Sequence, residues 1–322
     1  MYKNTLTLEN GITALLLHEN ITKNEIPDHT LSDVWIVNHE NPWMVKQFLQ
    51  NIIKHPDPHV YLKPVFLQKN FKKAYREKKN YNLKHLCDGY IDHLKLEDRI
   101  ASVEFIIHFI KNLQNTEEMY SSTVLQKILW YYYSRNKKIE FRESSDSLNG
   151  YTYPRIEAYY SGRKESYLAV KEMLTQAYKS GFLTRNYADT SHLCHKCSSG
   201  FLNYREECPK CAGHNLQARS LIHHFRCAYV ASEDLFQKDE RMICPKCNTE
   251  LKNLGVDYDK PSKIFCCRKQ DCRNEFQQPL IGVRCINCKT EQAPSTLKVE
   301  KIYQYEITSQ AIDDIIKPHT IG

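Results

Sequence analysis

The cysteines of this chain gather near one end, and most of them come in pairs. Of the 13 cysteines, all but Cys87 lie after residue 190. Four pairs have the spacing C-x2-C, namely Cys194/Cys197, Cys208/Cys211, Cys244/Cys247 and Cys285/Cys288. Such a pair places two sulfurs one tight turn apart, which is half of a tetrahedral zinc site. In a reducing compartment the pattern favours metal binding over disulfide formation. We therefore expect zinc ribbons here.

Neighbouring pairs are the first candidates to share a metal ion. Cys194/Cys197 with Cys208/Cys211 predicts one site, because the ten-residue gap "SSGFLNYREE" has room for a short hairpin. Cys285/Cys288 needs a second pair, which "FCCRKQDC" supplies as Cys272 with either Cys266 or Cys267. Of these two we place Cys267 in the predicted set, although the spacing leaves the choice open.

Cys227 has no cysteine companion, and the pair Cys244/Cys247 lacks two ligands. A closed zinc site normally has four protein ligands, so a histidine is expected to complete this one. His224 has the spacing H-x2-C before Cys227, and His223 is the alternative. His192 and His195 could compete at the first site, but four cysteines already fill it.

The predicted ligands are then enough for three structural zinc sites with four ligands each. The predicted ligands are Cys194, Cys197, Cys208, Cys211, His224, Cys227, Cys244, Cys247, Cys267, Cys272, Cys285 and Cys288. A catalytic zinc keeps one position for water, and the motif H-E-x-x-H does not occur in the chain. No glycine-rich phosphate loop or nucleophile elbow is found either. We therefore expect no enzyme, no catalytic residue and no organic cofactor.

The segment from about Ser191 to Thr308 resembles a known family. "HHFRCAYV" (His223–Val230) and "GVDYDKP" (Gly255–Pro261), followed by "CINC", are similar to the Thaumarchaeal output domain. That family is a metal-binding module proposed as an output unit of prokaryotic signalling proteins. The resemblance implies regulation or assembly and implies no known reaction.

The motif "GVDYDKP" also has an interpretation from its own residues. Asp257 and Asp259 could bind a cation or a partner, but a turn in which an aspartate accepts from backbone N–H groups is the favoured interpretation. We expect Tyr258 to pack on the neighbouring zinc site.

The middle of the chain is expected to be helical. Apolar residues recur at helical spacing over about Ile100–Leu113 and Met119–Ser134, and again from Tyr167 to Tyr178. Gly181 then favours a helix end, and "FLTRNYADTSHL" predicts two strands around a polar turn. Helix followed by hairpin is typical of a winged helix. Glu143–Pro154 is predicted to be a connecting loop.

The N-terminal part has the pattern of an α/β unit. Asp33–Asn38 and His59–Leu67 predict strands, and Trp43–His55 between them predicts a helix, so the strands should be parallel. Residues 31–67 resemble part of a response-regulator receiver. Asn38 stands where a receiver has its phosphorylated aspartate, so the resemblance implies a degenerate receiver.

Composition and charge limit the remaining possibilities. The chain is 41% hydrophobic and 26% charged, as folded proteins are, and no run of 18 apolar residues predicts a membrane span. The N-terminus does not resemble a signal peptide, so we expect a cytoplasmic protein. The formal charge of +7 is concentrated in Lys69–Lys84, where Phe71, Tyr75 and Tyr81 interleave with the cations. This segment could contact nucleic acid or face water as a solvated helix or loop.

Together these patterns predict a multidomain α+β protein. The expected parts are an α/β receiver-like unit (1–68), a helical segment (69–142), a winged-helix-like segment (150–190) and a multi-zinc ribbon domain (191–322). The predicted function is a zinc-binding signalling adaptor whose ribbon module binds a protein. The alternative is a zinc-dependent, nucleic-acid-binding transcriptional regulator that uses the winged helix and the basic segment. The partner and the oligomeric state do not follow from the sequence.

Overall fold

The computed structural model describes residues 5–8, 11–18, 26–69, 83–92, 100–113, 121–160 and 166–320. The chain forms two compact units. Unit 1 comprises Met1–Ser191 together with Glu300–Gly322, and unit 2 comprises His192–Val299. This division differs from the four expected segments, since residues 300–322 lie in unit 1 and not with the cysteine-rich region.

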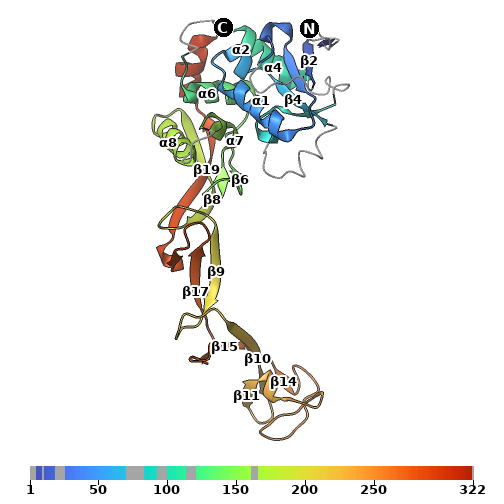
Figure 1. Cartoon of the computed structure of the whole chain (residues 1–322), viewed down its shortest axis with the longest axis vertical. Coiled ribbons are helices and arrows are strands. Elements are labelled where there is room, and N and C mark those ends of the chain that lie inside the picture. Colours follow the sequence, from blue (N-terminus) through green and yellow to red (C-terminus); the bar gives the residue numbers. More distant parts are fainter. Residues whose placement is uncertain are drawn as a thin grey trace. The chain divides into compact units, whose positions relative to one another are not determined.

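Unit 1 contains a five-stranded sheet in the order β1-β2-β3-β4-β5 (Figure 1). The strands are β1 (Thr5–Thr7), β2 (Thr13–Leu17), β3 (Val34–Val37), β4 (Val65–Gln68) and β5 (Gly89–Ile91). β2 to β5 are parallel, and β1 is antiparallel to β2. Every residue of β3 and β4 is buried, which explains the apolar sequence of β3 and of β4 as far as Leu67.

The predicted parallel strand, helix and strand is confirmed as β3, α1 (Pro42–Lys54) and β4. The oxygen of the Asn41 side chain accepts from Trp43 N–H at 3.0 Å and starts α1, with Pro42 at the first helical position. The prediction of a strand over His59–Leu67 is wrong for the first half of that range. Asp57 caps a short helix there, α2 (Pro58–Tyr61), and β4 begins only at Val65.

The resemblance to a receiver is not confirmed. Receiver-type sheets have the strand order 2-1-3-4-5, whereas the parallel strands here follow the order of the sequence. Asn38 is at the position that corresponds to the phosphorylated aspartate. The nitrogen of its side-chain amide lies 2.9 Å from Nδ1 of His18.

In the middle of unit 1, helices lie at the places that the apolar spacing predicts. They are α4 (Ile100–Lys111), α6 (Val124–Ser134) and α8 (Ser166–Lys179). α6 and α8 pack into one core with the C-terminal residues, where Trp130 donates its indole N–H to Ile315 O at 3.2 Å. The C-terminal turns comprise α9 (Ser309–Ala311) and a π-helical turn (Ile312–Ile316). The expected loop over Glu143–Pro154 carries part of a small hairpin of β6 (Arg142–Glu143) and β7 (Tyr151–Thr152), followed by α7 (Pro154–Glu157).

The winged-helix prediction is wrong in its second half. After α8 the chain forms one strand, β8 (Leu183–Leu193), where two strands and a turn were expected. β8 pairs with β19 (Lys298–Ile307), which arrives from the far end of the sequence (Figure 1). Because β19 supplies the partner edge, the polar residues at the middle of β8 stay extended and no wing forms.

Unit 2 consists largely of antiparallel strand pairs. β9 (Leu202–Glu207) pairs with β17 (Leu280–Cys285), and β17 also pairs with β18 (Glu291–Gln292). β10 (Leu216–His224) pairs with β15 (Lys263–Cys267) near its start and with β11 (Tyr229–Ser232) and β14 (Tyr258–Asp259) near its end. β16 (Glu275–Phe276) pairs antiparallel with β15, and β12 (Gln237–Lys238) pairs with β13 (Arg241–Met242).

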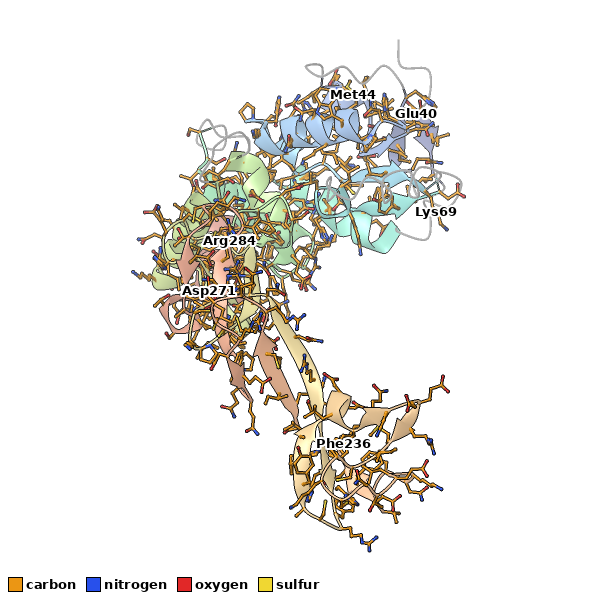
Figure 2. The ribbon with its side chains drawn as sticks, turned by 60° about the horizontal axis from the view of Figure 1, so that its bottom comes forward. Glu40, Met44, Lys69, Phe236, Asp271 and Arg284 are labelled. Atoms are coloured by element: carbon orange, nitrogen blue, oxygen red, sulfur yellow. The ribbon has the colours of Figure 1, made fainter. Side chains whose placement is uncertain are left out.

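Hydrophobic burial is distributed unequally between the two units. The three larger apolar clusters belong to unit 1. The apolar cluster described in unit 2 is small and consists of Ile222, Phe236, Leu251 and the thiol-bearing Cys244. Figure 2 marks Phe236, which is fully buried there. Along the described residues, no helix is long and apolar enough to cross a membrane.

Candidate metal centres

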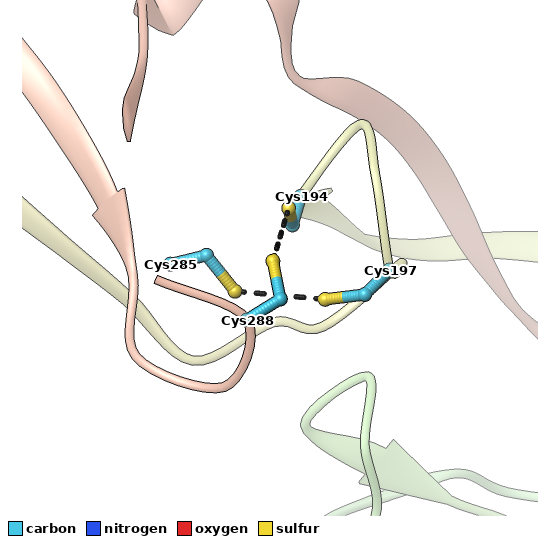
Figure 3. Close-up of side chains that lie close together, drawn as sticks. All are labelled: Cys194, Cys197, Cys285 and Cys288. Carbon is cyan, nitrogen blue, oxygen red and sulfur yellow. Dashed lines mark hydrogen bonds between the residues drawn. The ribbon is translucent and has the colours of Figure 1, made fainter. Parts of the chain in front are cut away.

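Four thiols meet where β17 ends, beside the segment that follows β8. The set, which we call set 1, is Cys194, Cys197, Cys285 and Cys288. The sulfur of Cys194 lies 3.7 Å from that of Cys288, and the sulfur of Cys197 lies 3.6 Å from that of Cys285 (Figure 3). Cys194 and Cys285 are fully buried, whereas Cys197 and Cys288 are partly exposed, so the set lies at the edge of the folded ribbon.

A second set of four thiols lies at the start of the β10–β15 ribbon. Set 2 is Cys208, Cys211, Cys267 and Cys272. The sulfurs of Cys208 and Cys272 are 3.7 Å apart, as are those of Cys211 and Cys267. The adjacent Cys266 is not in the set, because its thiol donates to a carboxylate oxygen of Glu275 at 3.1 Å.

The third set includes a histidine. Set 3 is His224, Cys227, Cys244 and Cys247. His224 Nδ1 lies 3.1 Å from the Cys227 sulfur and 3.4 Å from the Cys247 sulfur, and the sulfurs of Cys227 and Cys244 are 3.6 Å apart. His223 faces away from this set, with its Nδ1 3.3 Å from a carboxylate oxygen of Asp259. The structure thus brings together the four residues predicted for this site.

The spacing within these sets is that of shared metal ligands. Two sulfurs bonded to one tetrahedral zinc ion lie about 3.8 Å apart, and a sulfur and a histidine nitrogen about 3.5 Å apart. A disulfide would need about 2.05 Å, so none of these cysteines is paired covalently. Each of the three sets can therefore hold a metal ion with four protein ligands.

The backbone repeats one turn at every pair of neighbouring ligands, which are five cysteine pairs and the pair His224/Cys227. The residue directly after the second ligand has a positive φ in all six cases, at Ser198, Ala212, Ala228, Asn248, Arg273 and Lys289. In the four C-x2-C pairs the N–H of that residue donates to the carbonyl of the first cysteine at 2.8–2.9 Å. The turn directs backbone N–H groups at sulfur: those of Lys210 and Cys211 donate to the Cys208 thiolate.

These N–H donors stabilise the thiolate form that a metal needs. Burial raises the pKa of Cys208, but the N–H groups of Lys210 and Cys211 outweigh it and hold the pKa at about 7. Burial likewise raises the pKa of Cys194, and the N–H groups of Cys197 and Lys196 with the Gln292 side chain bring it below its ordinary value.

The predicted pairing of cysteines in sets 1 and 2 is wrong. We expected Cys194/Cys197 to join Cys208/Cys211, and Cys267/Cys272 to join Cys285/Cys288. Instead the first of these pairs along the chain, Cys194/Cys197, meets the last, Cys285/Cys288. The two pairs between them, Cys208/Cys211 and Cys267/Cys272, meet each other. The reason is that β9 pairs with β17, which carries residue 285 back beside residue 202.

The other residues singled out in the sequence have structural roles. One carboxylate oxygen of Asp257 accepts from Lys252 N–H at 2.9 Å and from Asn253 N–H at 2.8 Å, which confirms the turn interpretation. Tyr258 packs on the small cluster that contains Cys244, as expected. The His195 ring lies 2.8 Å from the Gln292 side-chain oxygen and is not in set 1. The basic segment Lys69–Lys84 lies mostly outside the described residues, so its predicted contact with nucleic acid stays a prediction.

Sequence reasoning did not single out a further group in unit 1, namely His29, Asp57 and His59. Asp57 accepts from His59 N–H at 2.8 Å as the cap of α2, and the His59 ring contacts the same carboxylate oxygen at 3.1 Å. Local hydrogen bonding explains this group, and its ligand-type spacing gave no sequence signal because His29 is distant along the chain.

The comparisons with known proteins agree with the geometry. The family model described as Thaumarchaeal output domain 1 matches residues 116–307, which is more than half of the chain. The chain belongs to the Thaumarchaeal output domain 1 family. No curated protein and no solved structure matched the chain.

The match confirms the resemblance seen in the sequence and extends it towards the N-terminus. It begins at residue 116 and not near Ser191, so it includes α6, α8 and β8 of unit 1 as well as all three sets of unit 2. Membership of an output-domain family indicates a signalling or output role.

Proposed function

We propose that this protein is a zinc-dependent signalling adaptor. Three structural zinc ions hold unit 2 in shape, and unit 2 presents a surface to a protein partner. The observation that carries the proposal is the set of three four-ligand clusters within a chain of the output-domain family. Thiolate and imidazole ligands in tetrahedral spacing are those that zinc prefers in structural sites.

The zinc ions act as structural centres and not as catalysts in this proposal. Each set supplies four side chains, so a tetrahedral ion keeps no position for water or substrate. The small apolar cluster of unit 2 gives a physical reason for the metal, because a short ribbon cannot bury enough apolar surface to fold without it.

A partner surface is proposed beside set 3. Leu254 and Val256 are 63% and 71% exposed, and both lie in the turn that Asp257 caps. Phe225 is also exposed, and its N–H donates to Asp257 O at 3.0 Å, which keeps it next to this turn. Exposed apolar side chains grouped in this way are typical of protein interaction sites.

Metal content tests the structural part. We expect His224→Ala to lower zinc from three ions to two per chain, and His224→Cys to retain three, because a fourth thiolate also closes the site. Elemental analysis of the purified proteins gives the count. Three zinc ions in His224→Ala would refute the assignment of His224 as a ligand.

Partner capture tests the adaptor part. Wild-type protein, Val256→Asp and the control Leu168→Asp, an exposed apolar position on α8, are each cross-linked in native extract and analysed by mass spectrometry. We expect a protein cross-linked through unit 2 in wild type and Leu168→Asp but not in Val256→Asp. An identical set of cross-links in all three proteins would contradict the proposed surface. Duplex DNA binding that weakens steeply with salt would favour the nucleic-acid regulator instead.

A further inference from the structure

Unit 1 contains a cavity of about 520 Å³ that neither the metal sets nor the proposed partner surface uses. It lies between η3 (Leu83–His85), the approach to β5, the segment after α6 and the start of α7. Its volume is within the range of sites that bind small molecules. The basic side chains that line it are Lys84, His85, Lys137, Lys138, Arg142 and Arg155.

The acidic side chains at the cavity are already paired. Asp88 accepts from Arg135 at 2.9 Å, and both side chains are buried. Glu140 is paired with Arg142 at 2.6 Å, and Lys138 with Glu306 at 2.7 Å.

Three cations at the cavity form no direct ion pair with any described residue, although Lys137 helps to lower the pKa of Asp88. Among the described residues, neither Lys84, Lys137 nor Arg155 has a carboxylate within ion-pair distance, so the cavity carries an excess of positive charge. An anion bound there would meet no unpaired carboxylate.

Arg155 is the most costly of these cations to bury. Only 5% of the residue is exposed. It donates to Leu86 O at 2.8 Å and to Tyr61 O at 3.1 Å, and its guanidinium lies 3.6 Å from the centre of the Tyr131 ring. Its Nε is buried and has no hydrogen-bond partner within the described structure. A buried charge without a counter-ion is unfavourable, so an anion in the cavity would supply what the protein itself does not.

The titration of His85 is consistent with a positive potential at the cavity. Burial lowers the pKa of its ring, and the charges of Arg142 and Lys84 lower it further, to about 4. His85 is therefore neutral near pH 7 and adds no charge to the cavity.

We propose that this cavity binds a small phosphorylated ligand. Arginine and lysine are the side chains that bind phosphate oxygens by charge-assisted hydrogen bonds. The volume exceeds what a single phosphate needs, and Tyr90, Tyr131 and Tyr132 contribute aromatic surface to its wall. The inference is independent of the partner surface on unit 2, since it concerns other residues in another unit.

The test is isothermal titration of the zinc-loaded, full-length protein at constant ionic strength. The probes are inorganic phosphate, pyrophosphate, AMP, ATP and GTP, with citrate as a non-phosphate anion and a short single-stranded oligonucleotide. We expect at least one of the small phosphorylated probes to bind with a Kd below about 1 mM, and citrate to bind more weakly.

Matched variants locate the binding. Lys84→Gln and Lys137→Gln remove exposed cations of the cavity and should each weaken binding by about tenfold or more. Lys179→Gln, at the exposed end of α8 and outside the cavity, should leave the affinity unchanged.

Three results would overturn the proposal. They are the absence of binding for every small phosphorylated probe, binding that neither cavity variant weakens, and binding of the oligonucleotide without binding of any mononucleotide. The last result would identify a nucleic-acid surface and not a small-molecule site. Thermal unfolding of each variant confirms that a lost interaction is not lost folding.

Discussion

Two adjacent cysteines show how strand geometry selects a ligand. Neighbouring side chains on a strand point to opposite faces, so Cys266 and Cys267 of β15 cannot both reach one metal ion. Cys267 lies in set 2, whereas the Cys266 thiol donates to Glu275. The same alternation separates His223 from His224 at the end of β10.

This separation predicts different metal contents for two otherwise similar variants. Cys267→Ser should reduce zinc from three ions to two per chain, because one ligand of set 2 is lost. Cys266→Ser should keep three and serves as the matched control. Elemental analysis decides the matter, and a full complement of zinc in Cys267→Ser would count against set 2.

His85 predicts a pH dependence of the stability of unit 1. Burial and the neighbouring cations lower the pKa of its ring from 6.5 to about 4 in the folded protein. Between these values the unfolded chain binds a proton that the folded chain does not, so the free energy of unfolding should fall as the pH drops below about 6.5. Above that pH the ring is neutral in both the folded and the unfolded chain, so His85 no longer lowers the free energy of unfolding.

The measurement is urea unfolding at several pH values, followed by tryptophan fluorescence. All three tryptophans, Trp35, Trp43 and Trp130, belong to unit 1, so the signal reports that unit alone. The difference in stability between wild type and His85→Gln should change between pH 7 and pH 5 in the direction stated. A difference that stays constant over this range would show that His85 is not buried as described.

At the scale of elements, local capping determines where several helices begin. α6 starts with a capping box in which the Thr123 hydroxyl accepts from Gln126 N–H at 3.3 Å and the Gln126 side chain accepts from Thr123 N–H at 2.8 Å. α6 also carries Trp130 and Tyr131 into the main core of unit 1. The cap therefore supports the helix on which that core depends.

Removing the cap gives a prediction at this scale. Thr123→Ala should lower the free energy of unfolding of unit 1 by about 1 kcal/mol, because the Gln126 N–H at the start of α6 loses its acceptor. Thr123→Ser retains a hydroxyl acceptor and should change stability much less. Urea unfolding monitored by tryptophan fluorescence measures both, and equal losses in the two variants would speak against the capping role.

At the scale of the whole molecule, the two units differ in their apolar clusters and in their ligand sets. Unit 1 has the extensive apolar clusters, whereas unit 2 has a small one and three ligand sets. A metal-dependent fold should therefore be confined to unit 2.

Chelation under reducing conditions tests this division. We expect the amides of residues 192–299 to lose their protection from hydrogen exchange, while the unfolding transition reported by the unit 1 tryptophans stays within about 1 kcal/mol of its original free energy. Addition of zinc should restore protection. Protection in unit 2 that survives complete removal of metal would contradict the proposed role of the ions.

The sequence alone was sufficient for what depends on near neighbours. The C-x2-C turns, the amphipathic helices and the H-x2-C spacing before Cys227 are encoded within a few residues, so each was visible without a structure. The same holds for β3, whose short apolar run with β-branched residues predicts a strand.

Only the tertiary structure decided what depends on distant partners. Cys194 meets Cys288 because β9 and β17 pair in one particular register, and β8 remains a single strand because β19 arrives beside it. Equivalent cysteine pairs are chemically interchangeable, so spacing cannot choose between adjacent and nested pairing. Strand pairing between segments far apart in the chain makes that choice, and no local pattern records it.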